Sequence, residues 1–222
     1  MAKIAEYELW KLVNIFLSIT RENFNSRIDP KSTFLWYIFG ENELKESISI
    51  QNFNLFEQAK SILIKEGSPR ELTVGIGYNL ERAEIPRIHI LLPSESPIQA
   101  GIGANEGYEP SEVNVTEGKR YQHYTANSSV TYNLLITSDN MNEVLVIYNW
   151  LKSITLSLNG QLELRGLQNC MFGGSDLNID ESLVPSNIFH RNFNLSFTYD
   201  YSVPDILGSQ TINSLDASGS LI

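Results

Sequence analysis

Residues 192–203 alternate without a fault between polar and apolar side chains. The apolar members are Phe193, Leu195, Phe197, Tyr199, Tyr201 and Val203, and the pattern stops at Pro204. Because successive side chains of a strand point to opposite faces of a sheet, this stretch predicts one long strand with an apolar and a polar face. A strand of that kind is typical of an antiparallel sheet that is covered on one side only. The rest of the chain therefore has to cover the apolar face of this sheet.

Two stretches near the N-terminus have helical spacing. Residues 3–20 predict an amphipathic helix. Asn54 is placed to cap a second, short helix that ends at Gly67. Between them the bulky run 34–39 fits a short buried strand, and a helical turn is the alternative.

A third helix is expected after residue 138. Asn140 with Glu143 three residues later forms a capping-box pattern, and the apolar residues that follow cover most of the helix circumference. We expect a long helix, buried on more than one side, that ends at Asn159–Gly160.

Period-two patterns predict the remaining strands. Residues 72–78 and 88–92 are interpreted as an antiparallel hairpin, in which Gly75 and Gly77 mark either a close approach to the backbone or a bend of the strand. Residues 130–136 form a further strand, and the stretches around 162–164 and 177–179 are strand-like.

Residues 93–129 interrupt these patterns with glycine, proline and few aliphatic side chains. Loops of this length are uncommon inside a compact domain, so the segment is either a surface insertion or an arm that binds a partner. Its candidate interface residues are Gly101, Gly103, Tyr108, Lys119, Arg120, Tyr121 and Tyr124. The last four, together with His123, form a basic and aromatic cluster that could contact phosphate or stack on bases, although nearby glutamates weaken that interpretation.

The predicted fold class is α+β, with helices packed on one face of a mostly antiparallel twisted β-sheet and a long loop or arm insertion. We expect a single domain over residues 1–205, with the insertion at 93–129, and a flexible C-terminal tail over residues 206–222.

The composition of the chain excludes some classes of function. The chain has 222 residues, 16 Lys+Arg and 26 Asp+Glu, for a net charge of −10. This balance argues against a protein that grips DNA or anionic membrane through a basic face. The single Cys excludes an internal disulfide, and charged residues in the first turns leave no room for an export signal. No apolar run is long enough to span a bilayer.

Motifs for chemistry are lacking, so we expect no enzyme, no metal and no cofactor. The three histidines stand apart, and the glycines at 101, 103 and 107 miss the spacing of a dinucleotide-binding loop. A Cys170–His190 pair remains geometrically possible, and Asp176 with Asp180 could pair as acid and base.

The order of expected elements resembles the tail-terminator and tail-completion proteins of tailed bacteriophages. The segments that carry the resemblance are 131–138 leading into 142–145 and 150–151, then 162–164, 176–179 and the closing strand through Pro204. It implies a virion component, assembled in the host cytoplasm, that forms a homo-oligomeric ring at the neck or tail and joins the head or portal to the tail. Its implied partners are copies of itself, other neck and tail proteins, and double-stranded DNA that passes the lumen without specific binding. No membrane is involved.

Two other classes stay open. A carbohydrate- or ligand-binding β-rich module would use the aromatic residues Trp36, Tyr108 and Tyr124. An enzyme would use Cys170 as its nucleophile.

Overall fold

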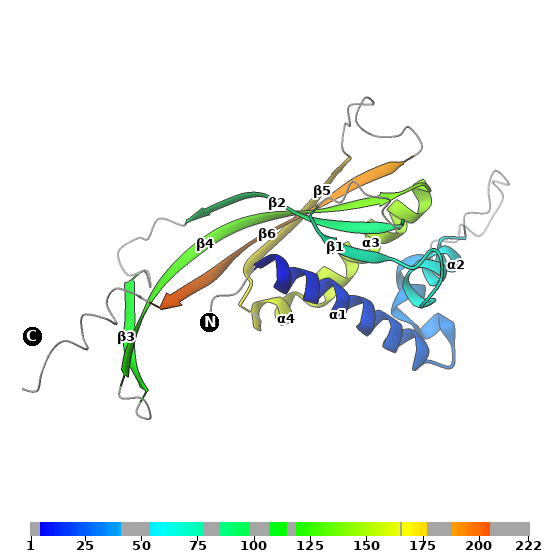
Figure 1. Ribbon diagram of the computed structural model, residues 1–222. Helices are drawn as coiled ribbons and strands as arrows, with labels where there is room; N and C mark the ends of the chain where they lie inside the picture. The colour runs from blue at the N-terminus through cyan, green and yellow to red at the C-terminus, as the bar shows by residue number, and fades with distance from the viewer. Residues whose placement is uncertain are drawn as a thin grey trace, which may run out of the picture.

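A mixed six-stranded sheet, covered by helices on one face, forms the molecule in the computed structural model (Figure 1). The structure describes residues 5–40, 54–77, 85–97, 107–114, 119–164, 166–176 and 188–204. In chain order the elements are α1 (Ala5–Asn25), a 3-10 turn η1 (Pro30–Ser32), a π-helical turn η2 (Trp36–Gly40), α2 (Leu55–Ala59), a π-helical turn η3 (Lys60–Ile64), β1 (Thr73–Ile76), β2 (Arg87–Pro97), β3 (Gly107–Asn114), β4 (Lys119–Ser138), α3 (Met141–Ser157), α4 (Asn159–Leu164), β5 (Gln168–Asp176) and β6 (Phe189–Pro204). The predicted α+β class is confirmed.

The strand order is β1-β2-β4-β6-β5, and β4 is the centre of the sheet. β6 pairs with β4 along one edge, from His123 opposite Pro204 to Ser138 opposite Phe189. Along the other edge β2 and β3 follow one another: the pairing with β2 stops at Ser128, and that with β3 begins at Thr125.

The core lies between the sheet and the helices. α1 packs against β1 and β2, and α3 packs against β4 and β6. On β6, Phe193, Leu195 and Phe197 are buried, which confirms the apolar face of the predicted closing strand. Trp150 of α3 is fully buried, and its indole N–H donates to Thr20 Oγ1 of α1 at 2.9 Å. The two longest helices are thereby joined beneath the sheet.

The predicted hairpin of residues 72–92 is wrong, because β1 and β2 run parallel, with Thr73 opposite Arg87 and Ile76 opposite Ile90. Alternation of side chains is the same in parallel and antiparallel pairs, so the pattern could not give the direction. The close approach, one of the two alternatives stated for Gly75 and Gly77, is confirmed at Gly75, where the Arg87 guanidinium occupies the place of a Cβ. At Gly77 φ is +75°, and a Cβ would meet no atom of the described residues within 4 Å, so the close approach is wrong there.

Two short segments predicted as strands are helical. Residues 34–39 belong to a helical turn that continues into η2, as in the alternative stated for them, and residues 162–164 belong to α4. α3 ends at Ser157, and Gly160 lies inside α4 rather than stopping a helix. The stretches 34–39 and 162–164 are too short for a helical period to be told from a strand period in the sequence.

The segment 93–129 is not one long loop. β2 continues to Pro97, β3 spans Gly107–Asn114, and β4 begins at Lys119. The sequences of these strands alternate only weakly between apolar and polar residues, so the sequence pattern missed them. The expectations for residues 177–179 and for the tail at 206–222 lie outside the described residues.

Candidate functional site

The long strands continue beyond the helical body at one end of the sheet (Figure 1). We call this extension the arm and define it as β3, residues 119–127 of β4 and residues 200–204 of β6. Within the arm, β4 is paired on both edges, with β3 from Gly107 opposite Thr125 and with β6 up to Pro204 opposite His123. The arm is therefore a hydrogen-bonded ribbon that the central strand carries outward.

The predicted interface residues in the described part of the chain all fall on this ribbon. Tyr108 of β3 stands opposite Tyr124 of β4 in the ladder. Tyr121, Arg120 and Lys119 follow along β4, opposite Glu112, Val113 and Asn114. Gly101 and Gly103 lie outside the described residues.

Acidic residues share the ribbon with the basic and aromatic cluster. Glu109 stands opposite His123, and Glu112 stands opposite Tyr121. A ribbon that carries both signs of charge is poorly suited to a phosphate backbone, which attracts cations alone. It suits a protein surface with charges of both signs.

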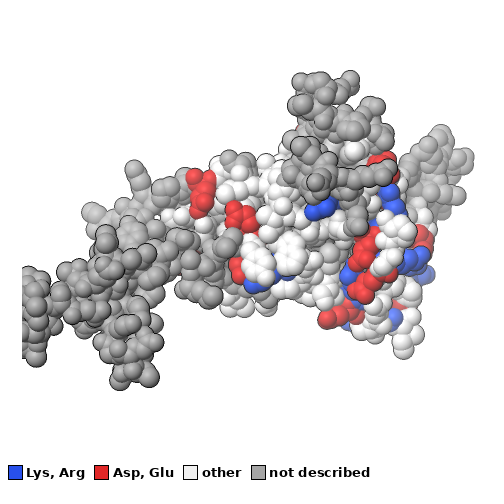
Figure 2. Space-filling view, viewed as in Figure 1, with Lys and Arg blue, Asp and Glu red and all other residues white. Residues whose placement is uncertain are grey.

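A second candidate surface is the sheet face that points away from the helices. Its rows pair Asn133 with Asn194 and Thr131 with Ser196, whose hydroxyl oxygens lie 2.9 Å apart. Most positions of this face carry Asn, Ser or Thr, and sequence analysis had recognised only that the face is polar. Charged side chains gather elsewhere, mainly where α2 and the C-terminal end of α1 lie (Figure 2).

Two histidines lie at one end of this polar face. His89 is buried, and burial lowers its pKa, with Nε2 3.3 Å from Thr137 Oγ1. Burial also lowers the pKa of His190, which stands opposite Thr137. Both imidazoles are thereby favoured in their neutral form. The His190 ring nitrogens and Asn192 Oδ1 are buried and have no hydrogen-bond partner within the described part of the structure.

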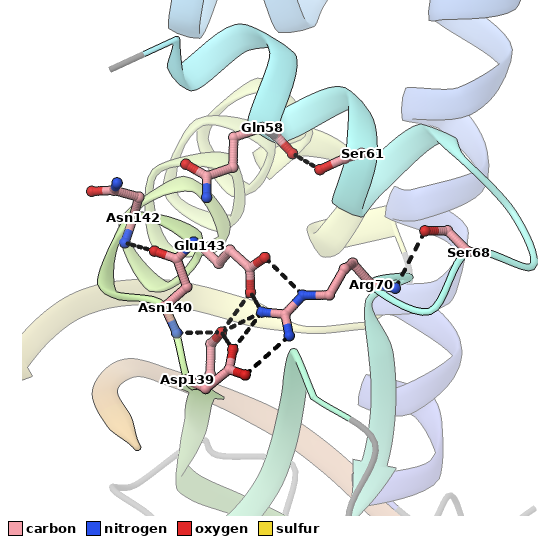
Figure 3. A network of polar contacts seen from close by, with 9 residues as sticks. Gln58, Ser61, Ser68, Arg70, Asp139, Asn140, Asn142 and Glu143 are labelled. Carbon is pink, nitrogen blue, oxygen red and sulfur yellow. Dashed lines mark hydrogen bonds and ion pairs between the residues drawn. The ribbon is translucent and has the colours of Figure 1, made fainter. Parts of the chain in front are cut away.

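An ion-pair network joins the segment before β1 to the start of α3 (Figure 3). The Arg70 guanidinium contacts the buried carboxylate of Glu143 and lies 2.5 Å from Asp139 Oδ1. Ser138 Oγ donates to Glu143 Oε2 at 2.5 Å. Hydrogen bonding to these carboxylates raises the pKa of Arg70, and Arg70 holds the pKa of Asp139 below its usual value. Because its charges are paired, we interpret this network as structural.

The network also corrects the predicted capping box. Asn140 caps α3 as expected, and its side chain accepts from the Asn142 N–H at 3.0 Å. Glu143, however, directs its carboxylate to Arg70 and Ser138. A basic residue distant in the sequence changed the role of the glutamate, which local spacing could not reveal.

The candidate catalytic pairs are not assembled. Gln168 pairs with Thr198 and Asp176 with Arg191, so Cys170 and His190 lie at opposite ends of the β5–β6 ladder, roughly 20 Å apart at ~3.3 Å per residue. Burial raises the pKa of the Cys170 thiol, which disfavours the reactive thiolate. Asp176 is bound by Arg191 at 2.7 Å, and Asp180 lies outside the described residues.

A groove beside α1 has a volume of about 670 Å³ and is lined by Arg21, Glu66 and Glu71 among others. Arg21 bonds both glutamates, at 2.8 and 2.7 Å, and the Leu63 carbonyl at 2.9 Å. These contacts hold the segments around the groove together and leave it without an unpaired guanidinium.

Within the described ranges, no group of three or more His, Cys, Asp or Glu side chains could hold a metal ion. Over the same residues, no helix combines the length and hydrophobicity that crossing a membrane requires. A scan against models of protein families gave no match, and a search of curated proteins gave none either. The site therefore has to be interpreted from its own geometry.

Proposed function

We propose that this chain is a structural component of a tailed-phage virion, in which copies form a ring at the neck or tail that joins the head or portal to the tail and surrounds the DNA channel. The arm is the observation that carries the proposal. The arm extends past the helical body as a ribbon with charges of both signs and paired tyrosines. It gives each subunit a surface that can contact its neighbours.

The charge distribution supports the proposed role of the ring. A net charge of −10 makes the subunit repel a phosphate backbone, and an acidic lumen would let DNA slide instead of binding it. In this role the protein is not an enzyme and uses no cofactor. The separation of Cys170 from His190 and the pairing of Asp176 with Arg191 fit that role.

Most of the arm, β3 and residues 119–127 of β4, can be removed at a defined place, which leaves residues 200–204 of β6 in the chain. Pro97 of β2 stands opposite Ser128 of β4, so replacing residues 98–127 by Asn-Gly would close the two strands with a two-residue hairpin turn. We expect this variant to keep the circular dichroism spectrum of a folded body and to lose ring assembly in mass photometry.

A second variant serves as the matched control. A chain that ends after Pro204 keeps every described residue of the arm, and we expect it to assemble like the full chain. Rings that form as well without the arm as with it would contradict the proposal.

A carbohydrate- or ligand-binding module is the second candidate, and the pair of Tyr108 opposite Tyr124 favours it. Trp36, the third aromatic residue considered for that role, instead packs edge-on against Phe56 in the body, with ring centroids 4.9 Å apart. Retention of the wild-type chain on an oligosaccharide column, and loss of retention in Tyr124→Ala, would favour this candidate over the ring.

A further inference from the structure

The outer edges of the sheet differ in how they are protected. An unprotected edge strand presents unpaired N–H and C=O groups that can pair with another chain. β1, at one end of the strand order, is only four residues long, and the Trp10 indole N–H of α1 donates to its Val74 carbonyl at 3.1 Å. That edge is short and partly blocked.

The edges of β2 and β3 contain residues that oppose pairing. β2 extends past β1 with Pro93, Pro97 and a register irregularity between Leu91 and Ser94. β3 contains Pro110 between the acidic residues Glu109 and Glu112. Proline, charge and bulges are the usual means by which proteins keep an edge from pairing.

β5 has none of these protections over Met171–Ser175, because the irregularity in its ladder with β6 lies before this stretch, between Gln168 and Met171. That stretch contains neither proline nor a charged residue, and its only strand neighbour within the described sheet is β6. Beyond the ladder with β6, its backbone groups make no hydrogen bond to the part of the chain that the structure describes. Met171 is 69% exposed, and a Cβ added at Gly173 would meet no atom within 4 Å.

We propose that the outer edge of β5 pairs in antiparallel orientation with β5 of a second copy, so that two sheets join into one. Opposite residues of a ladder share a face, so two identical antiparallel strands must pair about a central residue. Centring on Phe172 pairs Met171 with the partner's Gly173 and Gly173 with the partner's Met171, within the regular stretch that follows the irregularity between Gln168 and Met171.

Size favours this register. Each exposed Met171 side chain stands opposite the bare Gly173 of the other copy, on the face away from the helices. A large side chain opposite a small one is the complementarity that cross-strand pairs require. The contact is isologous, and it does not depend on the proposed function.

Cross-linking between two single-cysteine variants tests the register. In a Cys170→Ser background, Met171→Cys and Gly173→Cys are purified separately and oxidised alone or mixed. The predicted register places the introduced thiol at position 171 of one copy directly opposite the introduced thiol at position 173 of the other. Identical positions are instead diagonal neighbours roughly 7–8 Å apart, too far for a relaxed disulfide.

We expect a disulfide-linked species of about twice 25.1 kDa at least ~10-fold more abundant in the mixture than in either variant alone. No cross-link in the mixture, or equal cross-linking of each variant alone, would overturn the proposal.

Two lysine substitutions test the contact without cysteines. Gly173→Lys places a charge on the open edge and should abolish the dimer measured by analytical ultracentrifugation. Gly160→Lys is the matched control, because a Cβ there also meets no atom within 4 Å and the residue lies in α4. Dimers that survive Gly173→Lys as well as Gly160→Lys would contradict the pairing. Rings that persist in Gly173→Lys would leave the proposed function intact while this contact fails.

Discussion

The two halves of β4 show how one strand can serve two purposes. Over residues 130–137 its apolar side chains are buried against α3, with Tyr132, Leu134 and Ile136 almost inaccessible. Over residues 119–127 the same strand lies in the arm, where its described neighbours are β3 and β6. Stability should therefore reside in the body, while assembly of the proposed ring should reside in the arm. Substitutions in the two regions are expected to separate these properties.

The largest effect is expected from Trp150→Ala in the body. Trp150 is fully buried and donates to Thr20 Oγ1, so truncation leaves a cavity and removes one of the hydrogen bonds of that hydroxyl, which keeps its bond to the Phe16 carbonyl. We expect a loss of about 4 kcal/mol in the free energy of unfolding, measured by urea denaturation. Leu156→Ala on the same helix, at a side chain that is 57% exposed, should change it by less than about 1 kcal/mol. Equal losses of unfolding free energy in Trp150→Ala and Leu156→Ala would contradict the placement of Trp150 in the core.

A smaller loss is expected from Arg70→Ala. The buried Glu143 carboxylate would lose its cationic partner but keep the Ser138 hydroxyl, and Arg70 itself is about one-third exposed. We expect a loss of about 2 kcal/mol in the same assay. Lys60→Ala breaks an exposed pair with Glu57 and should cost less than about 0.5 kcal/mol. A neutral Arg70→Ala would show that the network contributes nothing to the body.

Acid should weaken the body through Asp139 and Glu71. Hydrogen bonds from Arg70 lower the pKa of Asp139, and the Gly67 N–H with Arg21 lowers that of Glu71. A carboxyl with a depressed folded-state pKa contributes stability that is present above its unfolded pKa, roughly 4, and is lost as pH falls through the folded value.

Urea midpoints measured downward from pH 5 should therefore decline, and the decline should be shallower in Asp139→Asn. Asp200→Asn, at an exposed residue of β6, is the control and should follow the wild type. If the urea midpoint declines with pH equally steeply in the two variants, Arg70 does not lower the pKa of Asp139 as the structure indicates.

The smallest effect on stability is expected from Tyr124→Ala in the arm. In the ladder it stands opposite Tyr108 of β3 and Val203 of β6, and Figure 1 shows this part of the ribbon far from α3. We expect the urea midpoint to stay within experimental error while assembly measured by mass photometry weakens. A loss of stability comparable to that of Trp150→Ala would show that the arm and the body unfold as one cooperative unit, which would contradict the separation of stability and assembly.

Long periodic segments were predictable from sequence because their own residues determine them. α1, α3 and the closing strand each have a continuous apolar stripe, and each was confirmed within a few residues. The parallel direction of β1 depends on how the chain returns at Arg87, which no pattern of side chains encodes.

The candidate site was only partly predictable. Tyr108, Lys119, Arg120, Tyr121 and Tyr124 were selected from composition, but their alignment on one ribbon depends on the pairing of strands whose sequences do not alternate clearly. The open edge of β5 was missed entirely, because an edge is defined by its absent neighbour and not by its own residues.

Mass photometry and negative-stain images of the wild-type chain across a concentration series would test the account most directly. We expect closed rings with a central hole, at several times 25.1 kDa. These rings should disappear when residues 98–127 are replaced by Asn-Gly. Particles without a hole at every concentration, identical with and without the arm and unable to bind phage portal or tail tube, would contradict it.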